Sequence, residues 1–327
     1  MTDLEDIRVA AVEGGGTSFV VAVAKLVPGD FPQILHQVAV DSSHDRPDQT
    51  LEECADFLKA HKPESGYAAL GIAIFGPVGL DPAKTTTYGR ILNSSPKRSW
   101  RNVDFLTPLS DACRGDRPFS VKVETDVNAP AFAEYLLVKD KLSSVAYVTV
   151  GTGVGVGLVI HGKPVHGSMH PEGGHVSVQP LEGDTFPGYS WGGNSPFHGR
   201  HTVEGIASSV ALTERLEAMT GQKNLPRSAL VDLDDDHEIW SHAANALANL
   251  CVTLLLTLSI EKIVFGGGVM NRSSLLQKIR ERTVVLLNGY LNLPEDLSEL
   301  ICRSDGNHAG MTGALVLAQS AYEECQA

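Results

Sequence analysis

The chain has 327 residues, of which 43% are hydrophobic and 20% charged, so a disordered or fibrous protein is excluded and about two domains are predicted. Lysine and arginine number 26 against 39 aspartates and glutamates, a net charge of −13. This charge argues against nucleic acid or an anionic membrane as a partner held by a broad basic surface. Backbone amides can still bind phosphate locally in an acidic protein.

Strands are predicted over 7–13, 18–26 and 33–40, with the tight turn Gly14-Gly15-Gly16 between the first two. Apolar residues then follow helical spacing over 48–61, and a strand begins at Ala68. The strand SVKVE, residues 120–124, ends just before a further helix. The first half therefore begins with the order β-β-β-α-β.

A second start follows at 145–160, where an apolar strand, a glycine-rich turn and another apolar strand recur, and the strand-like KPVHG comes next at 163–167. Helices are predicted over 202–220, 237–259, 272–288 and 310–322, with a strand at 260–268. The repeated plan indicates two α/β domains facing one cleft. A Rossmann fold is disfavoured, because its GxGxxG joins a strand to a helix, whereas these glycine clusters join strand to strand.

Cysteine usage and the start of the chain both indicate the compartment. The five cysteines are scattered without a CxxC pair, which favours a reducing environment. The first residues are acidic and lack the basic start of a signal peptide. The apolar stretch 243–259 contains Asn245 and Asn249 and then meets Glu261 and Lys262, so we interpret it as a buried helix rather than a membrane span. We expect a cytoplasmic protein.

Two glycine-rich hairpins, 12–17 and 150–155, each offer unobstructed backbone N–H groups and a threonine hydroxyl, which suit the oxygens of a polyphosphate. Either one alone is equally compatible with a hairpin turn that binds nothing. Two of them, one opening each half, favour a nucleotide. A third cluster, 265–270, ends a strand before a helix, where it either admits an adenosine ring or forms an ordinary turn.

Asp126 stands where a strand ends and a helix begins. An aspartate there is often only a helix N-cap. If the hairpins hold a triphosphate, however, a carboxylate nearby is the group needed to accept the proton of an attacking sugar hydroxyl.

Histidines and carboxylates concentrate in HPEGGH, residues 170–175, and SPFHGRHTVEG, residues 195–205, within a connection from 164 to 204 that is long enough to suggest a function. Surface histidines are the plain alternative. Their clustering favours a polar ligand site, a metal site, or both.

Eight motifs in order carry a family resemblance: EGGGTS, GPVGLD, TDVNAP, GTGVGVG, HPEGGH, SPFHGRHTVEG, FGGGVM and GNHAGMTGA. Together they resemble the ROK family of sugar kinases, most closely its fructokinases, from about Val9 to Ala318.

The resemblance implies an α/β, two-domain actin-like (ribonuclease-H-like) fold that closes over ATP and a sugar, with domains at 1–127 plus 311–327 and at 128–310. It also implies Mg²⁺ as cofactor, a homodimer, and Asp126 as catalytic base. The implied ATP-binding residues are Glu13, Gly14, Gly15, Gly16, Thr17, Ser18, Gly151, Thr152, Gly153, Gly155, Gly267, Gly268 and Met270. The implied sugar-binding residues are Gly76, Pro77, Asn102, Thr125, Asp126, Glu172, His175 and Glu204.

The sequence departs from the family at two places. Ser18 replaces a frequent lysine and leaves the first loop without a cation. Ser195 and His201 occupy the two cysteine positions of the family's zinc segment, so the zinc ligands would be His175, His198 and His201. A neutral serine hydroxyl is a poor zinc ligand. We therefore expect hydrogen bonds and the packing of Trp191 and Phe197, rather than zinc, to order this segment.

The resemblance predicts ATP-dependent phosphorylation of a hexose, D-fructose to D-fructose 6-phosphate in particular. Mannose, glucose or an N-acyl amino sugar is the alternative substrate. A sugar-responsive regulator is a further alternative. It is disfavoured because such regulators need an N-terminal helix-turn-helix, whereas the first phosphate loop already begins at Glu13. A non-catalytic sugar-binding protein is disfavoured by the presence of Asp126.

Overall fold

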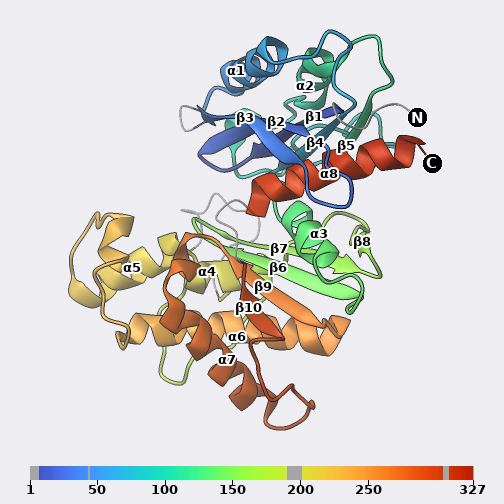
Figure 1. Cartoon of the computed structure of the whole chain (residues 1–327). Coiled ribbons are helices and arrows are strands. Elements are labelled where there is room, and N and C mark those ends of the chain that lie inside the picture. Colours follow the sequence, from blue (N-terminus) through green and yellow to red (C-terminus); the bar gives the residue numbers. More distant parts are fainter. Residues whose placement is uncertain (1–6, 43–44, 190–200, 305–308, 327) are drawn as a thin grey trace. The chain divides into compact units, whose positions relative to one another are not determined.

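A five-stranded sheet forms the centre of each half of the chain (Figure 1). The computed structural model describes residues 7–42, 45–189, 201–304 and 309–326. The first of its two units comprises Met1–Leu137, Lys163–His170 and Gly306–Ala327, and the second comprises Val138–Gly162 and Pro171–Asp305. The chain thus leaves the first unit and returns to it twice.

The first sheet has the order β3-β2-β1-β4-β5. Its strands are β1 (Arg8–Gly14), β2 (Ser18–Lys25), β3 (Gln33–Asp41), β4 (Ala69–Ile74) and β5 (Ser120–Thr125). The first three pair antiparallel through short turns, whereas β4 and β5 run parallel to β1. This confirms the predicted β-β-β-α-β order and brings the carboxyl ends of β1, β4 and β5 to one edge of the sheet.

Residues alternate between the two faces of this sheet, so each face has its own core. Val12 and Ile72 face the cluster covered by α1 (Pro47–Ala60) and α2 (Leu106–Cys113). Ala11 and Ala73 face the other cluster, which is completed by α8 (Ala309–Gln326) and α3 (Asn128–Leu136). The short helix η2 (Arg98–Trp100) adds the fully buried Trp100 to the first cluster.

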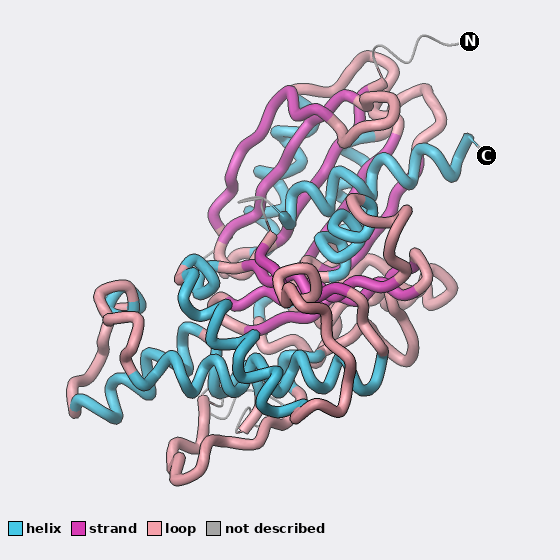
Figure 2. The backbone as a smooth tube through the Cα atoms, turned by 60° about the horizontal axis from the view of Figure 1, so that its bottom comes forward, coloured by secondary structure: helices cyan, strands magenta, loops and turns pink. Residues whose placement is uncertain are grey.

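Helix α8 lies unusually close to the sheet because glycines remove the side chains between them. A Cβ on Gly71 of β4 would lie 1.9 Å from the carbonyl oxygen of Ala314, and one on Gly313 would lie 2.5 Å from the backbone of Ala129 in α3. Figures 1 and 2 show α8 running beside the first sheet although it is the last helix of the chain. The first unit therefore depends on the chain's final helix.

The second sheet has the order β10-β9-β6-β7-β8. Its strands are β6 (Ser144–Val150), β7 (Val154–Ile160), β8 (Lys163–Pro164), β9 (Lys262–Gly266) and β10 (Ile301–Arg303). As in the first sheet, the first two strands form an antiparallel hairpin and the last two run parallel to the first. The order of strands is thus the same in both halves, which confirms the predicted repeat.

The helices of the second unit are α4 (Val203–Ala207), α5 (Ser209–Thr220), α6 (Glu238–Leu258) and α7 (Ser273–Leu287), with single turns η3 (Gly173–His175), η5 (Arg227–Leu230) and η6 (Gly268–Asn271). The helix predicted over 202–220 is in fact two. Ser208 has an extended backbone, and its hydroxyl accepts a hydrogen bond from the amide of Ala211 at the start of α5. Serine favours this capping position over a helix interior. Helix α2 and strand β10 were not predicted.

Among the described residues, α6 alone is long and apolar enough to cross a membrane by length and composition. Its apolar window is 67% buried inside the protein, and Ile239, Leu247 and Cys251 are completely buried. The core helices of soluble proteins pass the same test. The interpretation of this stretch as a buried helix is confirmed.

Helix α3 and the segment Lys163–His170 belong to the first unit. The reason is local packing, because Asn128 at the start of α3 donates from its side chain to Glu124 of β5 (3.2 Å) and to the carbonyl of Val165 (3.4 Å).

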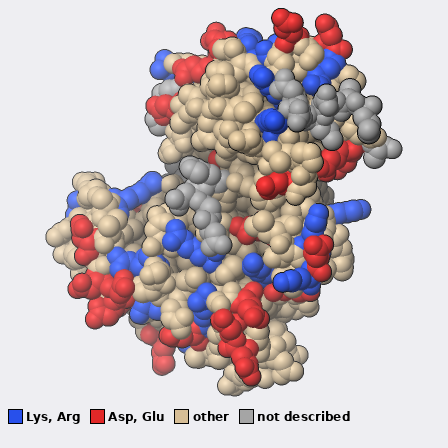
Figure 3. Space-filling model, in the orientation of Figure 1, with Lys and Arg blue, Asp and Glu red and all other residues tan. Residues whose placement is uncertain are grey.

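Charges of both signs are interspersed on the face shown in Figure 3. This pattern accords with a chain in which 26 basic residues are outnumbered by 39 acidic ones. An anionic ligand must therefore be bound by particular groups rather than by a general field.

We expect Gly71→Ala to lower the stability of the first unit by about 1–3 kcal/mol or more, because the methyl group would overlap the backbone of α8. Urea unfolding followed by circular dichroism measures this. Gly167→Ala is the matched control, since nothing lies within 4 Å of its Cβ position. An equal effect of the two substitutions would contradict the close approach of α8.

Candidate functional site

The first glycine hairpin connects β1 to β2, and its tip is open. The amide of Gly15 donates to the carbonyl of Ser18 (3.0 Å), and Gly16, Thr17 and Ser18 are exposed. Gly14 is different, because a Cβ there would lie 2.7 Å from Ile74. Packing thus requires glycine at position 14. At Gly16 the absence of a side chain leaves the backbone N–H group accessible to a ligand.

Glu13 lies at the end of β1 next to the start of α8. A Cβ on Gly310 would lie 1.9 Å from the Glu13 carboxylate, so a glycine at this point of α8 makes room for it. The side chain is half-buried, and burial raises its pKa above the ordinary value. The motif GNHAGMTGA therefore contributes to the site through Gly310.

Asp126 follows β5 at the same edge of the sheet. Its amide donates to the carbonyl of Ile74 at the end of β4 (3.0 Å). Burial, followed by the nearby charge of Glu13, raises the pKa of the Asp126 carboxyl to about 7, although its own backbone hydrogen bond and the cation of Lys97 oppose the shift. A carboxylate tuned to this range can accept a proton near neutral pH.

The capping alternative for Asp126 is resolved by its neighbour. The amide of Asn128 at the start of α3 donates to the hydroxyl of Thr125 (2.9 Å). Thr125 is buried, and its hydroxyl serves the start of the helix. Asp126 is thereby left available for another role.

Lys97 was not predicted as a site residue. Its ammonium group lies 4.5 Å from the centre of the Phe75 ring and 5.8 Å from that of Trp100. Burial lowers the pKa of Lys97, while the charges of Asp45 and Asp126 raise it. Lys97 is therefore a cation partly withdrawn from water near the candidate base. In the sequence, the one indication that Lys97 belongs to the site is its position between the GPVGLD motif and Asn102.

The segment after β4 is held by a histidine. The amide of Val78 donates to Nε2 of the buried His170 (3.1 Å), and a Cβ on Gly76 would lie 2.9 Å from the same ring. The carbonyl of Pro77 accepts from the amide of Leu92 (2.7 Å). Gly76 and Pro77 are thus positioned tightly in the first unit, as a binding segment requires.

Asn102 is exposed and has a φ of 61°. Asparagine tolerates this left-handed conformation better than most residues. Its carbonyl accepts from Arg90 (3.0 Å), and its amide donates to the carbonyl of Ile91 (2.8 Å). The backbone around Asn102 is therefore fixed within the first unit.

The second glycine hairpin connects β6 to β7 in the second unit. The amide of Gly151 donates to the carbonyl of Gly153 (2.9 Å), and Thr152 is exposed at the tip. The carbonyl of Gly151 accepts from the amide of Ser209 (2.7 Å) at the start of α5. Gly155 lies opposite Thr149 in the strand pair.

Glu204 joins this hairpin to α4. Its carboxylate accepts from the amide of Val154 (2.9 Å), and a Cβ on Gly153 would lie only 2.5 Å from the same oxygen. The glutamate is buried. One reason for glycine at 153 is therefore the carboxylate of Glu204, a contact that the sequence did not reveal.

Glu172 and His175 flank η3, with their side chains 3.7 Å apart. A Cβ on Gly174 would lie 1.8 Å from the carbonyl of Val154. The HPEGGH motif therefore packs directly on the second hairpin, and Glu172, His175 and Glu204 all belong to its surroundings.

Part of the candidate zinc segment lies outside the described residues. His198, Ser195, Trp191 and Phe197 lie outside the described residues. His201 is described and exposed, with its carbonyl accepting from Val178 (2.7 Å). The described part of the chain holds no group of three or more His, Cys, Asp or Glu side chains arranged for a metal.

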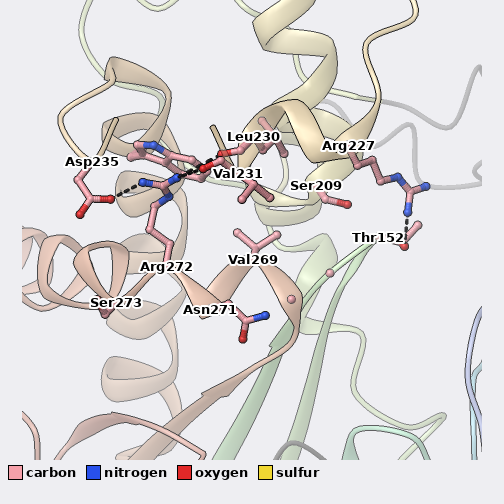
Figure 4. A pocket seen from close by; sticks show the side chains of 13 residues that line it. Thr152, Ser209, Arg227, Leu230, Val231, Asp235, Val269, Asn271, Arg272 and Ser273 are labelled. Atoms are coloured by element: carbon pink, nitrogen blue, oxygen red, sulfur yellow. Dashed lines mark hydrogen bonds and ion pairs between the residues drawn. The ribbon is translucent and has the colours of Figure 1, made fainter. Parts of the chain in front are cut away.

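A pocket of about 630 Å³ opens in the second unit beside the second hairpin (Figure 4). Its lining consists of Gly151, Thr152, Ser209, Arg227, Leu230, Val231, Asp235, Trp240, Gly268, Val269, Asn271, Arg272 and Ser273. It combines apolar side chains with a hairpin suited to phosphate, the combination that a nucleotide requires.

The third glycine cluster lies at this pocket. Gly267 has a φ of 88°, and a Cβ there would lie 2.5 Å from the backbone of Val150, so glycine is required. Gly268 lines the pocket, whereas Met270 is completely buried and belongs to the core.

The pocket wall includes two residues that were not predicted. The guanidinium of Arg272 lies 4.4 Å above the ring of Trp240. It also donates to Asp235 and to the carbonyls of Leu233 (2.8 Å) and Val231 (3.1 Å). Trp240 and Arg272 lie far apart in the sequence, so no local pattern predicts their contact in this wall.

The model of the family described as the ROK family matches residues 9–321. A fructokinase of Zymomonas mobilis is 35% identical over 316 residues, which cover 95% of this chain and 96% of that protein. The ROK hexokinase of Thermus thermophilus has a TM-score of 0.72 at 22% identity and covers 97% and 99% of the two chains. A ROK glucokinase of Streptomyces griseus, solved with glucose and AMPPNP, has a TM-score of 0.69 at 21% identity and covers 96% and 99%. The expected fold class is confirmed.

We expect Gly153→Ala to destabilise the second unit, because its methyl group would collide with the Glu204 carboxylate. Glu204→Asp, whose side chain is one carbon shorter, should relieve the clash. The double variant should therefore show a coupling of about 0.5–3 kcal/mol by thermal unfolding. Gly151→Ala is the control, since nothing lies within 4 Å of its Cβ position. Strict additivity would refute the contact.

Proposed function

Because the chain belongs to the ROK family, we propose that it is an ATP-dependent hexose kinase that converts D-fructose to D-fructose 6-phosphate. The similarity to a fructokinase over 95% of the chain supports fructose as the substrate. The observation that carries the proposal is the environment of Asp126, whose pKa is raised to about 7 at the edge of the sheet that also bears the first glycine hairpin.

Asp126 acts as the general base in this proposal. It accepts the proton of the C6 hydroxyl while that oxygen forms a bond to the γ-phosphorus and the bond from the γ-phosphorus to ADP breaks. A carboxylate with an ordinary pKa would be a weaker base, so burial beside Glu13 serves the chemistry. Proton acceptance of this kind contributes about 10²–10⁴ in rate.

The nucleotide binds to the pocket of the second unit. Its apolar residues Leu230, Val231 and Val269 would contact the adenosine, while Gly151 and Thr152 would donate to phosphate oxygens. AMPPNP in the similar glucokinase supports ATP as the donor. Gly16 and Thr17 of the first hairpin are exposed and would bind the transferred phosphate.

The hexose is bound by polar groups that the family resemblance assigns. These groups are Gly76, Pro77, Asn102, Glu172, His175 and Glu204. Carboxylates and imidazoles accept and donate the directional hydrogen bonds that distinguish sugar hydroxyls. Selectivity among hexoses depends on these contacts.

Magnesium fits the carboxylates of the first unit. Burial, followed by the charge of Glu13, raises the pKa of Asp126, and carboxylate oxygens are ligands that Mg²⁺ accepts. Glu13 would hold the ion together with phosphate oxygens. When bound, Mg²⁺ would neutralise charge on the phosphates.

Two alternatives to a fructokinase are distinguished by the assay described below. The similar glucokinase was solved with glucose, so glucose, mannose or an N-acyl amino sugar is the second candidate substrate. A sugar-responsive regulator without activity is the other alternative. A cytoplasmic homodimer is part of our proposal, by analogy with the family.

A coupled ADP-release assay on a panel of hexoses tests the proposal. We expect kcat/KM to be highest for fructose. A higher value for another hexose would replace fructose but keep the kinase, whereas turnover of none of the sugars would overturn the kinase assignment. Size-exclusion chromatography with light scattering tests the homodimer.

Asp126→Asn should lower kcat by at least about 10² and leave hexose binding intact, because only the proton acceptor is lost. In the unmodified protein, kcat/KM should fall as the pH decreases below about 7, since Asp126 is then protonated. Stopped-assay kinetics from pH 5.5 to 9 measure both. Near-native turnover in the asparagine variant would eliminate Asp126 as the base.

Lys97→Met should move the acidic limb of this pH profile to higher pH, because the cation that favours the ionised form of Asp126 is removed. Lys84→Met is the control, since Lys84 pairs with Asp81 (3.6 Å) at an exposed position. Coincident profiles for all three proteins would rule out an effect of Lys97 on the base.

A further inference from the structure

We propose that Arg227 binds the phosphate chain of the nucleotide and supplies the cation that the second glycine hairpin lacks. This inference rests on the proposed function, because it requires a nucleotide in the pocket of the second unit. It assigns a substrate-binding residue outside every glycine motif of the sequence.

Arg227 reaches the second hairpin directly. It is the first residue of η5, and its Nη1 donates to the hydroxyl of Thr152 (2.7 Å) at the hairpin tip. Figure 4 shows this side chain extending toward Thr152, on the opposite side of the pocket from Arg272. The guanidinium therefore lies where the hairpin amides would receive phosphate.

The guanidinium retains donors for a ligand. Arginine has five N–H groups in a planar fork that matches phosphate oxygens. Arg227 is exposed, and the bond to Thr152 uses one nitrogen. Thr152 thus orients the side chain without neutralising its charge.

The other arginine of the pocket is already committed. Arg272 forms an ion pair with Asp235, donates to backbone carbonyls and lies against Trp240. Its charge is balanced by a carboxylate, and its role is to build the wall. Among the residues that line the pocket, Arg227 is therefore the cation available to an anion.

The hairpins themselves create the need for this charge. Gly14 to Ser18 and Gly151 to Gly153 offer amides and neutral hydroxyls but no basic side chain. The chain has a net charge of −13, so its general field repels a triphosphate. A local arginine offsets this repulsion and adds charge-assisted hydrogen bonds.

Isothermal titration calorimetry with ADP and with adenosine tests the inference. Arg227→Met should weaken ADP binding by about 10- to 100-fold and leave adenosine binding unchanged, because only phosphate contacts are lost. Arg227→Lys should restore part of the ADP affinity. The salt dependence of ADP binding should be smaller in Arg227→Met than in the unmodified protein.

Lys223→Met is the matched control. Lys223 is exposed on the connection that precedes η5, so this variant removes the same charge from the same region without touching the hairpin. It should bind ADP like the unmodified protein.

Three outcomes would overturn the inference. They are unchanged ADP binding in Arg227→Met, an equal loss of adenosine binding, and an equal effect of Lys223→Met. In each of these the unmodified protein still binds ADP, so the proposed function survives. An unmodified protein that binds neither ADP nor ATP would refute the proposed function together with the inference.

Discussion

The burial of two carboxylates, Glu13 and Asp126, at one edge of the first sheet is the constraint on which the candidate site depends. Burial disfavours the ionised form of each carboxylate, and the charge of Glu13 adds to this effect at Asp126. The fold holds them nonetheless, because β1 and β5 end at the same edge of a parallel array. Gly310 clears the space for one, and Lys97 offsets the charge of the other. Strain of this electrostatic kind is typical of sites that bind cations or move protons.

The same strand order has different surroundings in the two units. In the first unit the hairpin between β1 and β2 accompanies carboxylates, whereas in the second the hairpin between β6 and β7 accompanies an apolar pocket. The family resemblance assigns Glu204 to the sugar. Its carboxylate also accepts a hydrogen bond from the amide of Val154, next to the second hairpin.

The sequence predicted the strands, the repeat and the two hairpins because period-two hydrophobic patterns and glycine turns are local signals. It missed β10, which has three residues, and the break at Ser208, where a serine interrupts an otherwise helical pattern. It also missed Lys97, Arg227 and the pairing of Arg272 with Trp240. These contacts join segments distant in the chain, and no local pattern specifies them. Met270 belongs to a motif that the family resemblance assigns to the nucleotide, and its side chain is completely buried.

Helix α8 has a consequence for the order in which the protein is made. The first sheet is synthesised early, but the helix that covers one of its faces comes from residues 309–326. Until then, the face that bears Ala11, Ala73 and Gly71 lacks the residues of α8 that complete its core. On the ribosome, the second unit has all its strands and helices before the first can close. The first unit is thus completed after the second. While α8 is still being synthesised, the alanine-rich face of the first sheet is exposed and must not associate with other apolar surfaces.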